Sequence, residues 1–451
     1  MKQDAQHLMS LVEKHKERII TAQQHIFDNP EVGFQEWETT KYLVEQFREL
    51  GYTPVEAGDI PGFYADLDTG IPGPKIAVFG ELDALIVPAH PKAKNGVVHA
   101  CGHNAQCAIL LGIAAAMKEP GATDGLCGSI RFIAVPAEEL IQVDYRRELV
   151  NKGLLHFLHG KGEFIYRGIL DNVDAAFLFH SSVPTEDNDF YYRDGNNGLT
   201  AKVIEYHGVS AHAGGAPYKG VNAMYAATLG LQAINSLRET FRDQDQVRVH
   251  PILTLGDCSV NAIPHYAKIE TYVRGKTLSS IQENSGKVNR ALAGAALSMG
   301  TGLDIYETGG YAPLRSDPKM GEIACRCMET VSPGKLVIRH IIGGGSTDMG
   351  DVSTLMPTVH PYACGVSGTP HGDNYCISDP VKACVNPAKA GVLMLHELLG
   401  ENAAQANAII AAYKPLYANA SEYCKAMEQT MKHLSFSVTT DDDGAVQATL
   451  K

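Results

Sequence analysis

The chain has 451 residues, which is too long for one ordinary hydrophobic core, so we expect about two domains. Hydrophobic residues make up 45% of the chain and charged residues 20%, as in soluble globular proteins, and the formal net charge of −13 argues against a nucleic-acid partner. No apolar run reaches the ~18 residues that span a bilayer, and residues 1–27 lack the pattern of a signal peptide, so we expect no membrane partner and a cytoplasmic location.

Apolar strands alternate with helices in the first part of the chain. The patterns predict helices over 5–28, 39–52 and 100–119, and strands over 75–85, 129–140 and 173–182. This alternation is typical of an α/β fold, in which a mostly parallel central sheet is flanked by helices.

Polar side chains close three of these strands. Glu81 and Asp83 end the first strand, Glu138 and Glu139 the second, and His180 the third. The carboxyl ends of parallel strands are where open α/β sheets build their sites. A single polar residue at a strand end is explained by the chain leaving the core. That explanation does not account for the whole set, which therefore predicts a site at this edge of the sheet.

A second, smaller domain is predicted after a polar, glycine-rich stretch at 191–198, which we interpret as a hinge. Strands are predicted over 199–208, 248–256 and 267–275, and helices over 222–239 and 280–300. This α+β block would bury only one sheet face, so we expect an inserted domain at 197–307. Residues 1–196 and 308–451 would form the first domain. The polar tail, 437–451, leaves two alternatives, disorder or an edge strand.

Side chains that bind zinc or manganese come from four distant segments. They are Cys101, His103, Glu139, His180 and His371. A structural zinc finger would place its ligands in close pairs, so this scatter is more typical of a catalytic site. Taken alone, Cys101 and His103 also fit a buried thiol and a satisfied histidine at the start of a core helix.

The tandem carboxylates of PAEE, residues 136–139, suggest a division of roles. Adjacent residues on an extended strand end point to opposite sides. A small turn there would let one carboxylate bind metal while the other acts as a general base. The alternative is two solvent-exposed acids at a strand terminus.

A family resemblance rests on motifs that occur in one order between about residues 25 and 375. They are HIFDNPEVGFQE, GELDAL, HACGHN, PAEE, HSS, GVSAHAG with GVNA, NAIP, GGGSTDMGDVS and HGDNY. The chain resembles the dinuclear-metal amidohydrolases of the aminoacylase and carboxypeptidase G superfamily. Within it, the chain is most similar to the branch that contains the aminobenzoyl-glutamate hydrolase and the indole-acetyl-amino-acid hydrolases.

The resemblance implies two divalent metal ions, zinc or manganese, in each copy of the chain, with Cys101 as the bridging thiolate. The other implied ligands are His103, Glu139, His180 and His371. It also implies Glu138 as the catalytic base and Asp83 as an acid that orients the site.

The small domain would then be a lid and a dimerisation domain. The resemblance implies that His212 reaches the site of a neighbouring copy and that Asn261 and Arg274 hold the substrate. The backbone N–H groups of 343–347, among them those of Gly344 and Ser346, would also face the substrate.

Three positions depart from the pattern of many relatives. Asn104 replaces an aspartate, which removes one negative charge, and Glu81 stands where many relatives carry a ligand histidine. HGDNY lacks the proline that commonly follows the last histidine, so His360 is the alternative to His371 as a ligand.

We therefore expect a homodimeric, metal-dependent amidohydrolase acting on a small-molecule amide with a free carboxylate. Its substrate would be an N-acyl or N-aroyl amino acid, such as an aminobenzoyl-glutamate-like amide, or a dipeptide. One alternative is a metal-free cysteine hydrolase with Cys101 as the nucleophile. Another is a non-catalytic relative that binds ligands or metal, although Glu138 and Glu139 are both present.

Overall fold

The computed structural model describes residues 4–256, 258–440 and 446–450, and it divides into two compact units. Unit 1 comprises the chain up to Gly195, Leu314–Gly343 and Asp351–Tyr423. Unit 2 comprises Asn196–Pro313, Gly344–Gly350 and the chain from Cys424 onward. In the described part of the chain, no helix is long and apolar enough to cross a membrane.

The central sheet of unit 1 is mostly parallel, as predicted. Its strands, in spatial order, are β1 (Val55–Glu56), β2 (Phe63–Asp68), β6 (Ser129–Val135), β3 (Lys75–Glu81), β7 (Ala175–Phe177) and β17 (Thr358–Val359). The strands from β6 to β17 pair in parallel, and β1 and β2 add antiparallel strands at one side. The carboxyl ends of β3, β6 and β7 therefore meet at one edge.

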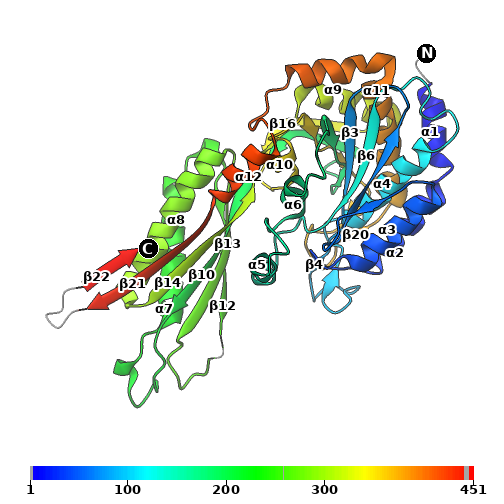
Figure 1. Cartoon of the computed structure of the whole chain (residues 1–451). Helices are drawn as coiled ribbons and strands as arrows, with labels where there is room; N and C mark the ends of the chain where they lie inside the picture. The colour runs from blue at the N-terminus through cyan, green and yellow to red at the C-terminus, as the bar shows by residue number, and fades with distance from the viewer. Residues whose placement is uncertain (1–3, 257, 441–445, 451) are drawn as a thin grey trace. The chain divides into compact units, whose positions relative to one another are not determined.

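Helices cover this sheet and enclose its core (Figure 1). They are α1 (Ala5–Glu13), α2 (Lys16–Phe27), α3 (Trp37–Glu49), α4 (His103–Met117), α9 (Pro318–Val331) and α11 (Asn386–Ala412). Every residue of α4 is buried, because this helix packs on β3 and is covered in turn by α2 and α11. The predicted helix over 5–28 is interrupted at Lys14 and His15. Both side chains bind Glu119, at 2.7 and 2.9 Å.

Smaller elements complete unit 1. They are the strands β4 (Leu85–Ile86) and β5 (Val97–Val98), the helices α5 (Val143–Asn151) and α6 (Gly160–Tyr166), and the pair β19 (Val366–Ser367) and β20 (Cys376–Ile377). A second sheet contains β15 (Leu314–Arg315), β9 (Phe190–Asn196), β18 (Tyr362–Ala363), β8 (His180–Ser181) and β16 (Leu336–Gly343). The predicted hinge over 191–198 is thus mainly strand β9, whose backbone pairs with β18.

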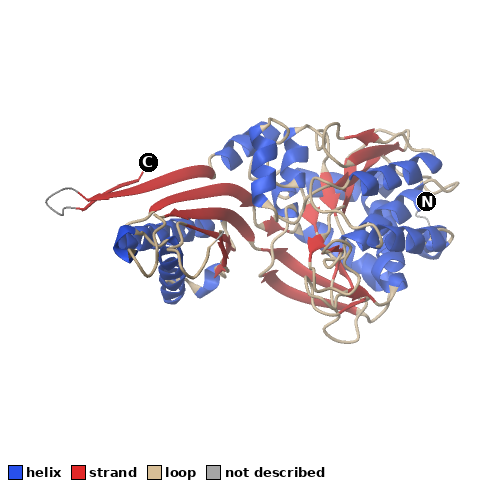
Figure 2. Cartoon of the chain, turned by 90° about the horizontal axis from the view of Figure 1, so that it is seen from below, coloured by secondary structure: helices blue, strands red, loops and turns tan. Residues whose placement is uncertain are grey.

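Unit 2 is an antiparallel sheet with helices on one face (Figure 2). Its strands are β11 (Arg248–Val249), β12 (Ile252–Leu255), β13 (Tyr266–Gly275), β10 (Gly198–His207), β14 (Gly302–Tyr311), β21 (Met431–Thr440) and β22 (Val446–Leu450). The helices α7 (Ala223–Ser236) and α8 (Leu278–Met299) bury the core of this unit. Two short helices, α10 (Met349–Val352) and α12 (Ala420–Glu428), also occur.

The C-terminal segment differs from the predicted domain boundaries. We expected 308–451 to lie in the first domain, but β21 pairs with β14, and the chain from Cys424 onward therefore belongs to unit 2. Of the two alternatives for the tail, the described residues form strands: β22 is the edge strand of this sheet, and β21 lies between it and β14. Residues 441–445 lie outside the described residues.

Close packing at Gly160 predicts a specific effect on stability. A Cβ atom at this position would lie 1.7 Å from the Pro136 carbonyl oxygen, so α6 can dock beside Glu138 and Glu139 only through a glycine. We expect Gly160→Ala to destabilise the protein by about 1–3 kcal/mol, the usual cost of overpacking, measured as a lower midpoint in urea unfolding. The matched control is Gly286→Ala in α8, where a Cβ would meet nothing within 4 Å and where alanine should stabilise by about 0.5–1 kcal/mol. Equal midpoints for the two variants would contradict this packing.

Candidate metal centre

The carboxyl edge of the central sheet in unit 1 gathers most of the predicted site residues. Glu81 ends β3, Glu138 and Glu139 follow β6, and His180 begins β8. His103 is the first residue of α4, whose amino end lies at the same edge.

Three local backbone conformations direct these side chains. Ala137 has a left-handed φ of 55°, which supplies the turn predicted before the paired carboxylates. Gly102 has φ 94°, and a Cβ there would lie 2.1 Å from the Ser181 hydroxyl oxygen, so only glycine fits between Cys101 and His103. His371 also has a left-handed φ, 63°, and its backbone N donates to the Ala100 carbonyl at 2.8 Å.

Two groups of potential ligands share one thiol. Cys101, His103 and His180 place their ligand atoms within 4.8 Å of one another, and Cys101, Glu139 and His371 do the same. The Cys101 sulfur lies 3.4 Å from Nε2 of His180, and Nε2 of His371 lies 3.2 Å from Oε1 of Glu139. A residue that belongs to both groups has the position that a bridging ligand requires.

A third group joins Glu81, His103 and Glu138. Nε2 of His103 lies 3.1 Å from Oε2 of Glu81 and 3.9 Å from Oε2 of Glu138. The two neighbouring carboxylates therefore face different partners, since Glu138 faces His103 and Glu139 faces His371.

Asp83 forms hydrogen bonds to two of the segments that carry site residues. Its backbone oxygen and its Oδ1 lie 2.8 and 3.1 Å from Nδ1 of His103, and its Oδ2 accepts from the backbone N of Glu139 at 2.8 Å. A hydrogen bond at Nδ1 places the ring proton there and leaves Nε2 as the atom that can bind a metal.

The electrostatics of the site favour the anionic forms of Cys101 and Glu139, and the same contacts raise the pKa values of His103, His180 and His371. Burial and the Glu139 carboxylate raise the pKa of the Cys101 thiol, but His180 and His103 outweigh both and lower it to about 6. Burial likewise raises the pKa of Glu139, but His371 and His103 lower it to about 2. A thiolate and a carboxylate are therefore present at neutral pH, and the thiolate is the form of cysteine that binds metals.

Comparison with known proteins identifies the family of this chain. The family model for peptidase family M20/M25/M40 matches residues 62–397. The chain belongs to this family. The Xaa-Arg dipeptidase of Mus musculus is 29% identical over 67% of this chain and 64% of its own length. One of the p-aminobenzoyl-glutamate hydrolase polypeptides of Escherichia coli is 27% identical over 65% of this chain and 58% of its own length. The matched region thus spans less than two thirds of these curated relatives.

Solved structures share the fold. A dinuclear metal binding peptidase of Bacillus subtilis from the M20 family superposes with a TM-score of 0.61 at 19% identity, covering 86% of this chain and 99% of that one. The aminobenzoyl-glutamate utilization protein of Klebsiella pneumoniae gives 0.64 at 19% identity, covering 86% and 98%.

His360, the alternative ligand, is buried behind His180, with the two ring centroids 5.4 Å apart. None of the three groups found among the described residues includes it. His371 has a left-handed backbone, and its Nε2 lies 3.2 Å from Oε1 of Glu139, so His371 stays the predicted ligand.

The predicted lid residues lie in unit 2, and their role stays a prediction. His212 and Asn261 are neighbours, because the backbone N of Ala213 donates to the Asn261 carbonyl at 2.9 Å. Arg274 lies near the far end of β13, and Gly344 and Ser346 belong to the short segment 344–350 of this unit.

Sequence reasoning missed two buried cations at the site. Nζ of Lys161 lies 2.6 Å from Oε1 of Glu81, and the Arg146 guanidinium donates to the Leu158 carbonyl at 2.7 Å and to the Glu139 carbonyl. Neither residue stands in a recognisable motif. Lys161 follows a glycine in a polar stretch, and such a pattern normally indicates an exposed loop.

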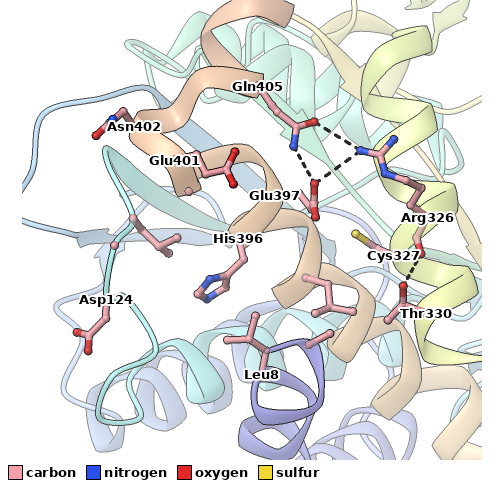
Figure 3. A pocket seen from close by; sticks show the side chains of 15 residues that line it. Leu8, Asp124, Arg326, Cys327, Thr330, His396, Glu397, Glu401, Asn402 and Gln405 are labelled. Carbon is pink, nitrogen blue, oxygen red and sulfur yellow. Dashed lines mark hydrogen bonds and ion pairs between the residues drawn. The ribbon is translucent and has the colours of Figure 1, made fainter. Parts of the chain in front are cut away.

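A cavity of about 700 Å³ in unit 1 contains none of the predicted site residues. Figure 3 shows Leu8, His396, Arg326 and Gln405 among the side chains that line it. Its central acid, Glu397, is already bound by Gln405 at 2.7 Å and lies 3.7 Å from Arg326. The size of this cavity is therefore no evidence that it is the catalytic site.

The shared thiol predicts the effect of its removal. Since Cys101 belongs to both potential metal groups, we expect Cys101→Ala to lose metal from both positions, whereas wild-type protein should hold about two ions per chain. Elemental analysis after removal of loosely bound metal measures this. Cys127→Ala is the matched control, because Cys127 is also a buried thiol of unit 1 and lies outside all three groups. A Cys101→Ala protein that keeps both ions would contradict the bridging position.

Proposed function

We propose that the chain is a metal-dependent amidohydrolase that cleaves the amide bond of an N-acyl or N-aroyl amino acid, or of a dipeptide. The observation that carries this proposal is the membership of Cys101 in two potential metal groups at once. The names of similar proteins support the substrate class: they include an Xaa-Arg dipeptidase, a p-aminobenzoyl-glutamate hydrolase and an indole-3-acetyl-aspartic acid hydrolase. Each of these names implies an amide that releases an amino acid with a free carboxylate.

Two divalent ions fit the donor set. Cys101, His103 and His180 would hold one ion, and Cys101, Glu139 and His371 the other. Thiolate and imidazole suit zinc, and the carboxylate also admits manganese. When bound, such ions polarise a substrate carbonyl and make water acidic enough to be a nucleophile at neutral pH.

Glu138 is the proposed general base. Its side chain lies beside His103 and is 8% exposed, whereas the carboxylate of its neighbour Glu139 contacts His371. It would take a proton from the attacking water and deliver it to the leaving amine, a role that suits a carboxylate next to a metal centre.

His212 is the proposed oxyanion donor. Its Nδ1 accepts the backbone N–H groups of Gly214 and Gly215, at 3.1 and 2.9 Å, so the neutral ring carries its proton on Nε2. An exposed N–H donor of this kind can stabilise the tetrahedral oxyanion of amide hydrolysis. Asn261 accepts from the Ser259 hydroxyl through Oδ1 at 2.6 Å, which leaves its amide group to donate.

One copy of the chain is not enough for the proposed site. Asn261 precedes β13 and Arg274 is its penultimate residue. At about 3.3 Å per residue, this strand spans about 30 Å, so both side chains cannot hold one substrate carboxylate. A homodimer resolves this if one copy supplies Arg274 together with the backbone of Gly344 and Ser346, and its partner supplies His212 and Asn261.

The surface of unit 2 supports such a dimer. Tyr225 and Leu229 on α7 are exposed, and so are Ile252 and Leu255 on β12. In the described chain β12 pairs with β13 alone, which leaves its other side open. Exposed apolar side chains on a helix and on a strand with an open side suit a two-fold interface.

The cysteines bear on the cellular context and on a competing reaction. All ten lie in the described chain, and no disulfide joins any of them, which supports the reducing environment of the cytoplasm. The contact between Cys101 and His180 also fits a cysteine nucleophile with its base, so a metal-free cysteine hydrolase is the second candidate.

A hydrolysis screen with metal-reconstituted protein tests the proposal. We expect turnover of N-acyl amino acids and dipeptides with a free carboxylate, and little turnover of the same compounds with an amidated carboxylate. Glu138→Gln should keep both ions and lose about 10²–10⁴-fold in rate, the usual contribution of a positioned base.

Glu139→Gln is the matched control, because it makes the same chemical change one residue away and should lose metal. Reversed outcomes would exchange the roles of the two carboxylates. Activity that survives complete chelation and disappears on alkylation of Cys101 would favour the cysteine hydrolase.

Mixing two inactive variants tests the shared site. His212→Ala and Glu138→Gln proteins should regain activity after the two proteins exchange protomers, because each hybrid dimer contains one site with neither defect. Activity is measured before and after exchange, and native mass spectrometry verifies that hybrids form. Hybrids without activity would place His212 outside the partner's site.

A further inference from the structure

A lysine side chain is completely buried beside the candidate metal centre. Lys161 is the second residue of α6, and both its side chain and that of Glu81 are 0% exposed. A fully buried lysine is rare without a specific partner, because removing its charge from water is costly. Its Nζ lies 2.6 Å from Oε1 of Glu81, which supplies that partner.

Both oxygens of Glu81 are held in place. Oε1 faces the Lys161 ammonium, and Oε2 accepts from Nε2 of Gln106 at 2.8 Å. Gln106 also accepts from the backbone N of Glu81 at 3.2 Å, so the two residues bind each other twice. The carboxylate is therefore fixed by a cation on one side and an amide on the other.

Glu81 is close to the proposed ion positions but is not part of them. Its Oε2 lies 3.1 Å from Nε2 of His103, the atom that would bind metal. Among the described residues, the two groups that share Cys101 do not include Glu81, which instead forms the third group with His103 and Glu138. A carboxylate without other partners at this distance would be drawn to a divalent ion, because carboxylate oxygens are ligands for zinc and manganese.

We infer that Lys161 is a positioning residue that keeps Glu81 from becoming a metal ligand. This inference rests on the proposed function. Catalytic metal sites need a coordination position that no protein side chain fills. By pairing with Oε1, Lys161 neutralises the carboxylate whose Oε2 lies beside Nε2 of His103, and it thereby preserves that position for the reaction.

A purely structural role makes a different prediction. If Lys161 only stabilised the fold, its removal would lower stability, metal affinity and turnover together. The chain offers a matched control in Lys202 of unit 2, whose side chain is also 0% exposed and forms an ion pair with Glu307. Lys202→Met removes a buried ammonium from a buried carboxylate in the other unit.

The experiment compares Lys161→Met, Glu81→Gln/Lys161→Met and Lys202→Met with wild-type protein. Metal affinity is measured by competition with a chelator, turnover with a substrate from the screen, and coordination from the visible spectrum of the cobalt(II)-loaded protein. In Lys161→Met we expect turnover to fall by about 10–100-fold while metal affinity is unchanged or higher. The cobalt bands should weaken, because an added ligand raises the coordination number.

The double variant separates the effect of the Glu81 charge from the effect of losing the packed Lys161 side chain. A neutral glutamine is a poor ligand, so Glu81→Gln/Lys161→Met should return the cobalt spectrum to that of wild type and recover turnover relative to Lys161→Met. Lys202→Met should leave metal affinity and the cobalt spectrum unchanged. Parallel loss of metal affinity and turnover in Lys161→Met, or no recovery in the double variant, overturns the inference.

Two further results keep the test decisive. If Lys161→Met does not fold, the double variant alone is informative, since the inference expects it to hold two ions with wild-type affinity and to turn over. Loss of an ion from it overturns the inference. If wild-type protein itself binds no ions or hydrolyses no amide, the proposed function fails, and this result is separate from any difference among the variants.

Discussion

One buried carboxylate, that of Asp83, fixes the geometry on which the candidate metal centre depends. It binds Nδ1 of His103 and the backbone N of Glu139 at the same time. His103 opens α4 and Glu139 follows β6, so a single side chain joins a helix end to a sheet edge. Asp83 is 1% exposed, and hydrogen bonds are stronger in such a low-dielectric environment than in water. The directions of two potential ligands, from segments far apart in the sequence, are therefore set by the same residue.

The backbone around this carboxylate adopts conformations that non-glycine residues normally avoid. Ala137 and His371 both have left-handed φ values, and such residues persist only where surrounding bonds hold them. The backbone N of Ala137 donates to Glu36 at 2.8 Å, and its carbonyl accepts from Gly160 at 3.2 Å. The backbone N of His371 donates to Ala100. Ala137 precedes a potential ligand, and His371 is one. The strained backbone at both positions therefore sets the direction of a site side chain.

Much of this site was predictable because parallel strands must deliver their ends to one edge. The alternation of strands and helices was enough to predict that the polar strand ends lie together. These ends carry Glu81, Asp83, Glu138 and His180. Lys161 was not predictable, since nothing in its local sequence reveals that α6 turns it inward onto Glu81. The placement of β21 was also hidden, because a strand late in the chain can join either sheet with a free edge, and its partner β14 lies more than a hundred residues earlier. At the interruption of the first predicted helix, Lys14 and His15 both bind Glu119, a tertiary partner that the local sequence does not reveal.

The C-terminal hairpin bears on the proposed dimer. By pairing with β14, β21 extends the sheet of unit 2, and β22 becomes the edge strand on that side. Exposed strand edges recruit other chains, so this sheet offers two edges to a partner. The opposite edge contains β12, which leads into the loop with Asn261 and thus to its neighbour His212. The proposed dimer uses the β12 edge, because that edge carries the residues needed by the partner's site.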